Sequence, residues 1–155
     1  MIRKMLDQDL RAVVKIYQEG IDTGVATFET KAPTPAEWNA KFHKDLRFVF
    51  EDNSVILGWI SVTPISAREV YKGVAEVSVY IKKSASGKGI GTALFEYLCE
   101  ESKQLGYWML QSSIFEKNYG SIALHKKVGF RLVGVREKIA QRNGVWHNTV
   151  LMEKY

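Results

Sequence analysis

The sequence predicts an α/β (mixed α+β) fold in which a central mixed, mostly antiparallel sheet of about six to seven strands is flanked by about four helices. Short apolar runs joined by turn residues, at Glu51–Asn53 and Asn143–Gly144, indicate hairpins. An apolar run at 74–81 leads into a glycine-rich stretch and then into residues with helical spacing, which indicates a strand-to-helix crossover. Hairpins combined with such crossovers favour a mixed sheet over a doubly wound parallel one.

Composition and charge limit the class of protein. The chain has 155 residues, of which 46% are apolar and 25% charged, and these ordinary values exclude a disordered or membrane-embedded chain. A formal net charge of +5 favours anionic ligands. The basic residues form no run of five or more, so a coenzyme phosphate accounts for them as well as a nucleic-acid groove would. Of the two ligands we expect the coenzyme, and no nucleic-acid partner.

The cysteine content and the absence of long apolar runs predict the location of the protein. Cys99 is the only cysteine, which excludes an internal disulfide and a cysteine-based zinc cluster. No apolar stretch approaches the ~18 residues of a membrane-spanning helix, and Met1–Lys4 leads into an amphipathic pattern rather than a signal-peptide core. We therefore expect a cytoplasmic protein without a membrane partner.

Two helices are predicted in the first third of the chain. Apolar residues recur at helical spacing over 10–17, and Asp7 stands where its carboxylate could accept hydrogen bonds from the free amides of the first turn. A second helix starts at Thr34, which is followed by Pro35 at the first helical position and by Glu37, the acidic residue of a capping box.

Three strands follow. The apolar runs at 48–50 and 55–62 are separated by a polar turn and predict an antiparallel hairpin. A third strand is predicted at 74–81, where Val74, Glu76, Ser78 and Tyr80 would share one face and the apolar residues between them the other.

The second half continues with a helix–strand–helix unit. Helical spacing over 90–105 predicts a long helix that ends near Gly106. A strand is predicted at 109–114, and Asn118 is expected to cap a helix that runs to residue 128 and stops at Gly129.

Two closing strands are predicted at 131–138 and 145–153, on either side of the Asn143–Gly144 turn signal. The sequence contains no internal repeat, low-complexity segment or linker. We therefore predict one domain that spans residues 1–155.

The glycine-rich stretch from Ser86 to Thr92 lies between a predicted strand and the long helix. At the start of a helix, unpaired amides can converge on an anion, and glycines let a phosphate approach the backbone. The spacing G-x-G-x-G differs from that of dinucleotide-binding and nucleotide-triphosphatase loops. From these residues alone, a phosphate site and a purely structural turn are both open.

The segment from Gly87 to Leu94 resembles the pyrophosphate-binding motif of the GNAT superfamily of N-acetyltransferases, which reads Q/R-x-x-G-x-G/A. Gly89 and Gly91 fit this motif, whereas Ser86 stands where the family usually has glutamine or arginine. The substitution removes one side chain from the phosphate site and leaves the backbone cradle intact.

Within this superfamily the chain is most similar to the phosphinothricin and methionine sulfoximine acetyltransferases, along nearly its whole length. The matching segments are Ala26–Thr30, Gly58–Trp59, Tyr71, Glu76–Ile81, the glycine loop, Asn118–Phe130 and Trp146–His147. The resemblance implies the GNAT fold, acetyl-coenzyme A (acetyl-CoA) as co-substrate, a small-molecule amine as acceptor and a homodimer. It also implies a bulge in the strand before the glycine loop, which would expose backbone groups to the coenzyme.

The resemblance implies a set of coenzyme-binding residues on that strand, in the loop and at the start of the last helix. These are Val79, Tyr80, Ile81, Gly87, Lys88, Gly89, Ile90, Gly91, Thr92, Asn118 and Ser121.

Three residues are candidates for proton transfer. Glu76 matches the catalytic glutamate of the family and is expected to act as general base through a water molecule, with a strand charge or salt bridge as the alternative. His125 stands where many relatives carry a tyrosine that protonates the thiolate. Because the acetyltransferases that the chain most resembles also have histidine there, a packed helix residue is favoured over an acid. His147 aligns with a histidine near the substrate and is an auxiliary base or a strand histidine.

The resemblance also implies the substrate-binding residues Phe28, Glu29, Arg68, Tyr71, Glu76, Val77 and Ser78. A guanidinium such as that of Arg68 can clamp a carboxylate or phosphinate in two parallel hydrogen bonds, which suits an amino-acid-like substrate. Ser66 replaces a second basic residue of the relatives, so the resemblance implies the class of substrate rather than phosphinothricin itself.

Direct transfer without a covalent acetyl-enzyme is expected, because Cys99 falls inside the long predicted helix. Three scattered histidines without paired carboxylates give no metal site. Two alternatives are acetylation of a protein N-terminus or lysine side chain, which needs an open groove, and a non-catalytic acyl-CoA-binding module.

Overall fold

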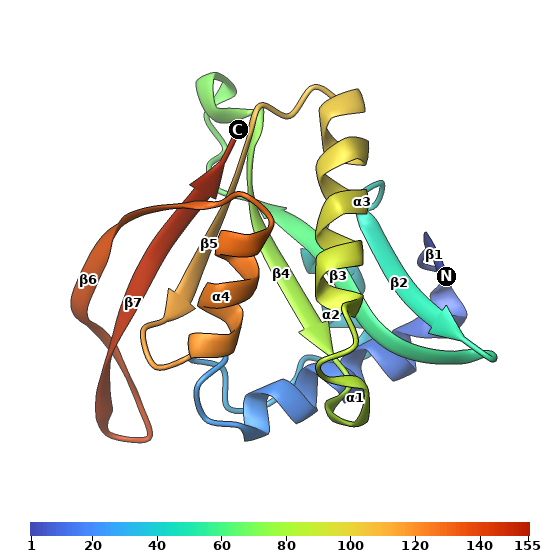
Figure 1. Ribbon diagram of the computed structural model, residues 1–155, viewed down its shortest axis with the longest axis horizontal. Coiled ribbons are helices and arrows are strands. Elements are labelled where there is room, and N and C mark those ends of the chain that lie inside the picture. Colours follow the sequence, from blue (N-terminus) through green and yellow to red (C-terminus); the bar gives the residue numbers. More distant parts are fainter.

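The computed structural model of residues 1–155 contains one seven-stranded sheet and four α-helices (Figure 1). The strand order is β1-β2-β3-β4-β5-β7-β6, and all neighbouring strands are antiparallel except β4 and β5. The predicted mixed, mostly antiparallel sheet is confirmed. None of the helices is both long and apolar enough to cross a lipid bilayer.

The strands are β1 (Ile2–Lys4), β2 (Arg47–Asp52), β3 (Val55–Pro64), β4 (Val74–Ile81), β5 (Met109–Phe115), β6 (Arg131–Arg142) and β7 (Val145–Lys154). The helices are α1 (Leu10–Asp22), α2 (Pro35–Lys41), α3 (Ile90–Gln104) and α4 (Tyr119–Lys127). Short 3₁₀ turns occupy Asp7–Asp9, Glu69–Tyr71 and Lys83–Ala85.

The helices cover both faces of the sheet (Figure 1). On one face α3 packs its buried residues, including Leu94 and Leu98, against Ile60 and Ala75 of the central strands. On the other face α1 and α2 enclose Trp59 of β3. The alternation of side chains along β3 and β4 therefore supplies both cores at once.

Local signals fix several helix ends as predicted. The Thr34 hydroxyl accepts a hydrogen bond from the Glu37 amide, and the Glu37 carboxylate accepts one from the Thr34 amide, so the capping box of α2 is complete. Gly106 and Gly129, which follow α3 and α4, have φ values of 89° and 98° that glycine adopts without strain.

Two strands differ from the prediction. β1 is a three-residue edge strand, too short to show a recognisable alternation in the sequence. β6 extends to Arg142 instead of ending at Lys138, and its pairing with β7 shifts between Leu132 and Gly134 and between Arg136 and Ala140. These irregularities interrupt the period of two on which the sequence prediction depended.

The expected role of Asp7 at the start of α1 was wrong, because no side chain accepts a hydrogen bond from the amides of the first turn of this helix. Asp7 lies in the 3₁₀ turn before the helix, while the Asp9 carboxylate accepts a hydrogen bond of 2.7 Å from the Leu6 amide. Arg3 binds both oxygens of Asp9, at 2.7 and 3.0 Å. The carboxylate thus connects β1 to the start of α1.

The partly buried pair of Arg3 and Asp9 predicts a pH-dependent contribution to stability. The guanidinium of Arg3 holds the pKa of Asp9 below its usual value. Since the folded-state pKa is the lower one, the stabilisation is complete above the unfolded pKa of about 3.9 and is lost as the pH falls through the folded value. We expect D9N to be less stable than wild type at pH 7 and its stability to vary less between pH 5 and pH 2.

Urea unfolding at each pH measures this effect, with D52N at the exposed end of β2 as a matched control. Equal pH dependence in wild type and D9N would contradict the assignment.

Candidate active site

The main cavity opens where β4 and β5 separate. These two strands pair only from Val74–Met109 to Glu76–Gln111, and beyond this point they diverge (Figure 1). The edge of β4 that faces β5 therefore has no strand partner over residues 77–81. A cavity of about 860 Å³ fills this opening and is lined by residues from both faces of the sheet.

The bulge expected in β4 is absent. The register between β3 and β4 runs without a shift from Gly58–Ile81 to Pro64–Ala75. The divergence of β4 from β5 instead frees the backbone edge that a bulge was expected to expose. The alternation along β4 is kept, and Tyr80 stacks on Trp59 with ring centroids 5.2 Å apart.

The glycine loop forms one end of the cavity. Gly87 and Gly89 have φ values of 77° and 79°, and a Cβ at either position would meet no atom within 4 Å. The first backbone bond of α3 runs from the Ala93 amide to the Gly89 carbonyl, so the three amides at 90–92 have no backbone partner. These donors form a cradle for an anion.

Gly91 has a different role. A Cβ at this position would lie 2.8 Å from Cδ2 of Leu124 on α4. The residue is buried, and its lack of a side chain lets α3 and α4 approach each other. Of the three motif glycines, two shape the loop beside the cavity and the third permits helix packing.

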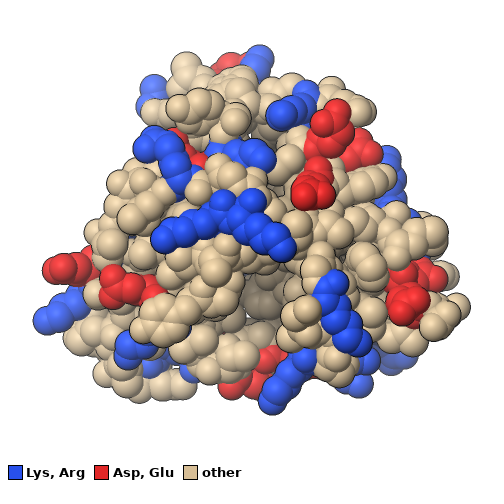
Figure 2. All heavy atoms as spheres, viewed as in Figure 1, with Lys and Arg blue, Asp and Glu red and all other residues tan.

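The surface around the opening is basic. Figure 2 shows a hollow in this face with Lys and Arg side chains on both sides of it. Lys127 of α4 lines the cavity, whereas Lys88, in the loop, is exposed and does not. Positive charge at this mouth favours an anionic ligand.

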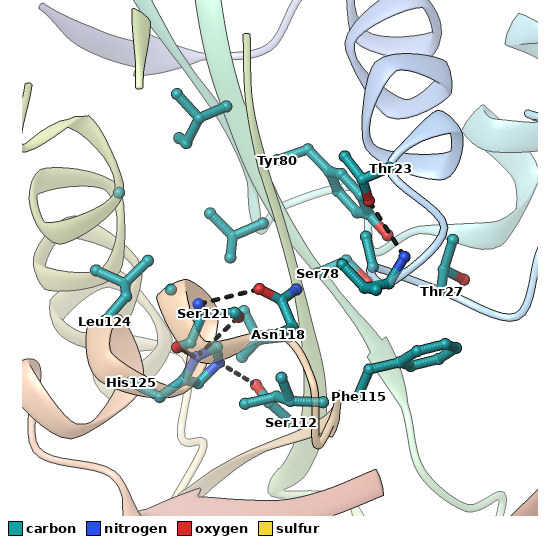
Figure 3. Close-up of a pocket in the computed structure, with 18 of the residues that line it drawn as sticks. Thr23, Thr27, Ser78, Tyr80, Ser112, Phe115, Asn118, Ser121, Leu124 and His125 are labelled. Atoms are coloured by element: carbon teal, nitrogen blue, oxygen red, sulfur yellow. Dashed lines mark hydrogen bonds between the residues drawn. The ribbon is translucent and has the colours of Figure 1, made fainter. Parts of the chain in front are cut away.

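The start of α4 adds polar groups to the same wall. The Asn118 side-chain oxygen caps the helix by accepting a hydrogen bond of 3.2 Å from the Ser121 amide (Figure 3). The Asn118 amide nitrogen has no partner within the protein and remains available as a donor. Asn118 and Ser121 both line the cavity.

His125 is buried in the wall, 2% exposed. Its Nδ1 lies 2.7 Å from the Ser121 carbonyl and its Nε2 2.8 Å from the Ser112 hydroxyl (Figure 3). A carbonyl only accepts, so Nδ1 carries the proton and Nε2 accepts from Ser112. Both nitrogens are thus used inside the protein, which favours the packed role over that of an acid.

The geometry of His125 predicts a neutral imidazole. Burial lowers the pKa of His125 below the value of about 6.5 that it has in the unfolded chain. At low pH, protonation of His125 therefore favours unfolding over a native state with a charged imidazole. We expect ¹⁵N NMR of labelled histidine to show the Nδ1–H tautomer of His125 at pH 6.5. A doubly protonated ring, or a proton on Nε2, would contradict this network.

On the other face of the sheet, the cavity is lined by the α1–α2 connection and by β4. Phe28 and Glu29 of the connection reach the same space as Glu76 and Ser78. Figure 3 shows Thr23, Thr27 and Tyr80 on one side of the central strand, with Asn118, Ser121 and His125 on the other. The opening between β4 and β5 thus joins the two sides.

Glu76 lies at the point where β4 and β5 separate. It is half-buried, pairs through its backbone with Thr63 and Gln111, and its carboxylate makes no hydrogen bond or ion pair. Val77 lines the cavity next to it. An unpaired, partly desolvated carboxylate at this position is available to accept a proton.

His147 does not line the cavity but packs against two aromatic residues that do. Its ring lies 4.7 Å from that of Phe115 and 6.1 Å from that of Phe28, both of which face the cavity. The structure therefore places His147 behind the aromatic wall.

The structure does not bring Arg68 and Tyr71 into the cavity. Both are exposed on the β3–β4 connection, at the end of β4 that is remote from the glycine loop, and the Arg68 guanidinium lies 5.5 Å from the centre of the Tyr71 ring. The remaining predicted residues, from Val79 to Ile81 and from Ile90 to Thr92, line it.

Several residues that line the cavity were not predicted from the sequence, among them Tyr17, Thr27, Lys41 and Ser112. Burial raises the pKa of Tyr17 and, further, that of Tyr80, so both phenols stay neutral. Tyr17 was assigned to the apolar stripe of α1, and no sequence pattern marks the others, because their place at the cavity depends on tertiary contacts.

The chain matches known acetyltransferases. Residues 13–130 match the family model described as "Acetyltransferase (GNAT) family". The phosphinothricin N-acetyltransferase of Alcaligenes faecalis is 31% identical over 99% of this chain and 81% of its own length.

Two crystal structures share the fold. The phosphinothricin acetyltransferase of Sinorhizobium meliloti, solved in complex with acetyl-CoA, has a TM-score of 0.89 and 29% identity over 99% of this chain and 86% of that one. A ribosomal-protein-alanine N-acetyltransferase from Brucella melitensis has a TM-score of 0.90 and 28% identity over 99% of this chain and 98% of that one. The chain belongs to the GNAT family and is an acetyl-CoA-dependent N-acetyltransferase similar to the phosphinothricin acetyltransferases.

Proposed function

We propose that the protein acetylates the amino group of a small amino-acid-like molecule of the phosphinothricin, methionine sulfoximine or methionine sulfone type. One observation carries the proposal: a single cavity joins the open glycine loop to the unpaired carboxylate of Glu76 through the gap between β4 and β5. A donor and an acceptor bound at the two ends would meet beside this carboxylate.

The residues present fit the coenzyme. The free amides of 90–92 and the open loop at Gly87 and Gly89 suit a pyrophosphate, and the unpaired edge of β4 at 79–81 suits the amide groups of a pantetheine arm. Asn118 and Ser121 offer polar contacts on the opposite wall. Acetyl-CoA supplies the acetyl group as an activated thioester.

The protein's own residues then prepare the acceptor. Glu76 receives a proton from the substrate ammonium through a water molecule, so the nitrogen lone pair can attack the thioester carbonyl carbon. The C–S bond of the thioester then breaks and coenzyme A leaves as the thiolate. Phe28, held by Phe115 and by His147 behind it, excludes water from the reacting end. In this proposal His147 positions the wall, and Cys99, half-buried in α3, takes no part.

The Brucella structure favours a second candidate, acetylation of a protein N-terminus. Such a substrate needs a groove that admits an extended chain, whereas the α1–α2 connection at 25–29 forms one wall of the cavity. The unpaired Glu76 argues against a module that only binds acyl-CoA. We therefore place the small-molecule amine first.

An assay of thiol release from acetyl-CoA tests the substrate class. Methionine sulfoximine, methionine sulfone, phosphinothricin, ordinary amino acids and an alanine-terminated peptide are compared at equal concentration. We expect turnover of the first group, with kcat/KM well above that for the peptide. Turnover of the peptide alone, or of none of these amines, would overturn the proposal.

We propose a homodimer in the cytoplasm. β6 is an edge strand that exposes Leu132, Val133 and Val135, and Trp146 of β7 is also exposed. Such an edge favours association with a second copy. The free thiol of Cys99 fits a reducing compartment. Light scattering is expected to give twice the mass of one chain, and a monomer would contradict the dimer.

A further inference from the structure

We propose that Lys41 recognises the carboxylate of the acceptor and so makes the enzyme selective for amino acids over simple amines. The proposal rests on the function proposed above and assigns a specificity residue to the same site. Lys41 is the last residue of α2 and lines the cavity on the side of Glu76.

Lys41 is the only cation at the acceptor end. The cavity is lined by two basic side chains, Lys41 and Lys127. Lys127 lies on α4, on the side where the glycine loop binds the coenzyme in the proposed function. Arg68, the residue that the sequence favoured for this task, lies outside the cavity.

The position of Lys41 is fixed by its neighbours. Trp38 and Phe42 are buried against Trp59, and their rings stack with centroids 4.4 Å apart. The next residue, His43, donates its amide to the Val62 carbonyl at 3.0 Å. Val62 precedes Thr63, which pairs with Glu76 on β4. The end of α2 is thus anchored on the strand that neighbours the proposed base.

The Lys41 ammonium is free to bind a ligand. It makes no hydrogen bond or ion pair, and its contact with an aromatic ring is with Phe42, at 5.4 Å from the ring centre. Glu29 and Glu76, the two carboxylates of the acceptor end, likewise have no ion-pair partner.

This arrangement of charges complements a zwitterion. An α-amino acid presents an ammonium, which suits the carboxylates, and a carboxylate, which suits Lys41. The flexible stem and three donors of lysine allow it to follow a small substrate without the fixed geometry of arginine. A simple amine lacks the group that Lys41 would bind.

The test compares methionine sulfone with methionine sulfone amide, in which the carboxylate is neutral. We expect K41A to lower kcat/KM for methionine sulfone by about 10- to 100-fold, the loss typical of a hydrogen bond to a charged group. The value for the amide should change less than about twofold, and K41R should restore part of the loss. The KM for acetyl-CoA should be unchanged.

K44A is the matched control, because Lys44 follows α2, is exposed and does not line the cavity. An equal loss of kcat/KM for both compounds in K41A would overturn the assignment. A loss confined to methionine sulfone in R68A, with none in K41A, would transfer the role to Arg68. Absence of turnover with either compound in the wild type would instead refute the proposed function and, with it, this inference.

Discussion

Replacement of Glu76 by glutamine is expected to lower kcat/KM for the acceptor at pH 7 by about 10²- to 10⁴-fold, the usual contribution of a general base. Glutamine keeps the shape and much of the polarity of the side chain but does not accept a proton. Because Glu76 lies at the acceptor side of the gap and away from the glycine loop, the dissociation constant for acetyl-CoA should be unchanged.

The pH dependence separates loss of a base from loss of structure. Without Glu76 the reaction depends on the small fraction of free amine in solution, so the rate of E76Q should rise about tenfold per pH unit up to the pKa of the amine. Wild-type activity should reach a plateau at lower pH. Wild-type turnover by E76Q at pH 7 would refute the assignment, and calorimetric binding of acetyl-CoA shows whether the site is intact.

Most of the fold was predictable because its signals are local. The capping box at Thr34 and Glu37 and the turn at Asn143–Gly144 act within a few residues, and they define element ends wherever they occur. β1 was not predicted because a strand of three residues is too short to show the alternation of side chains. Its pairing with β2 also depends on contacts between residues far apart in the sequence. The bulges of β6 likewise arise from its register with β7.

The candidate site was predictable where its residues lie in one continuous segment of the chain. The glycine loop and Glu76 belong to a single strand–loop–helix unit, so their common cavity follows from chain order. The sequence does not show whether Lys41 or Arg68 reaches the cavity. Both are isolated basic residues in the sequence, and only the anchoring of α2 on β3 and the length of β4 decide which one reaches the cavity.

The glycine loop offers the second large effect, through the substitution G89V. Gly89 has a φ of 79°, caps α3 and faces open space, so a side chain there would project where the proposed pyrophosphate binds. We expect the dissociation constant for acetyl-CoA, measured by isothermal titration calorimetry, to rise at least about tenfold, as for loss of one charge-assisted hydrogen bond. The strained backbone should also cost about 1–2 kcal/mol of stability.

G144V separates strain from ligand contact. Gly144 lies in the β6–β7 turn with a φ of 77°, and a Cβ there also meets no atom within 4 Å, but it does not line the cavity. Both variants should therefore lose a similar few degrees of melting temperature, while only G89V should bind acetyl-CoA more weakly. Equal affinities of the two variants for acetyl-CoA would mean that Gly89 only allows the backbone turn. The anion site would then depend on other groups of the loop.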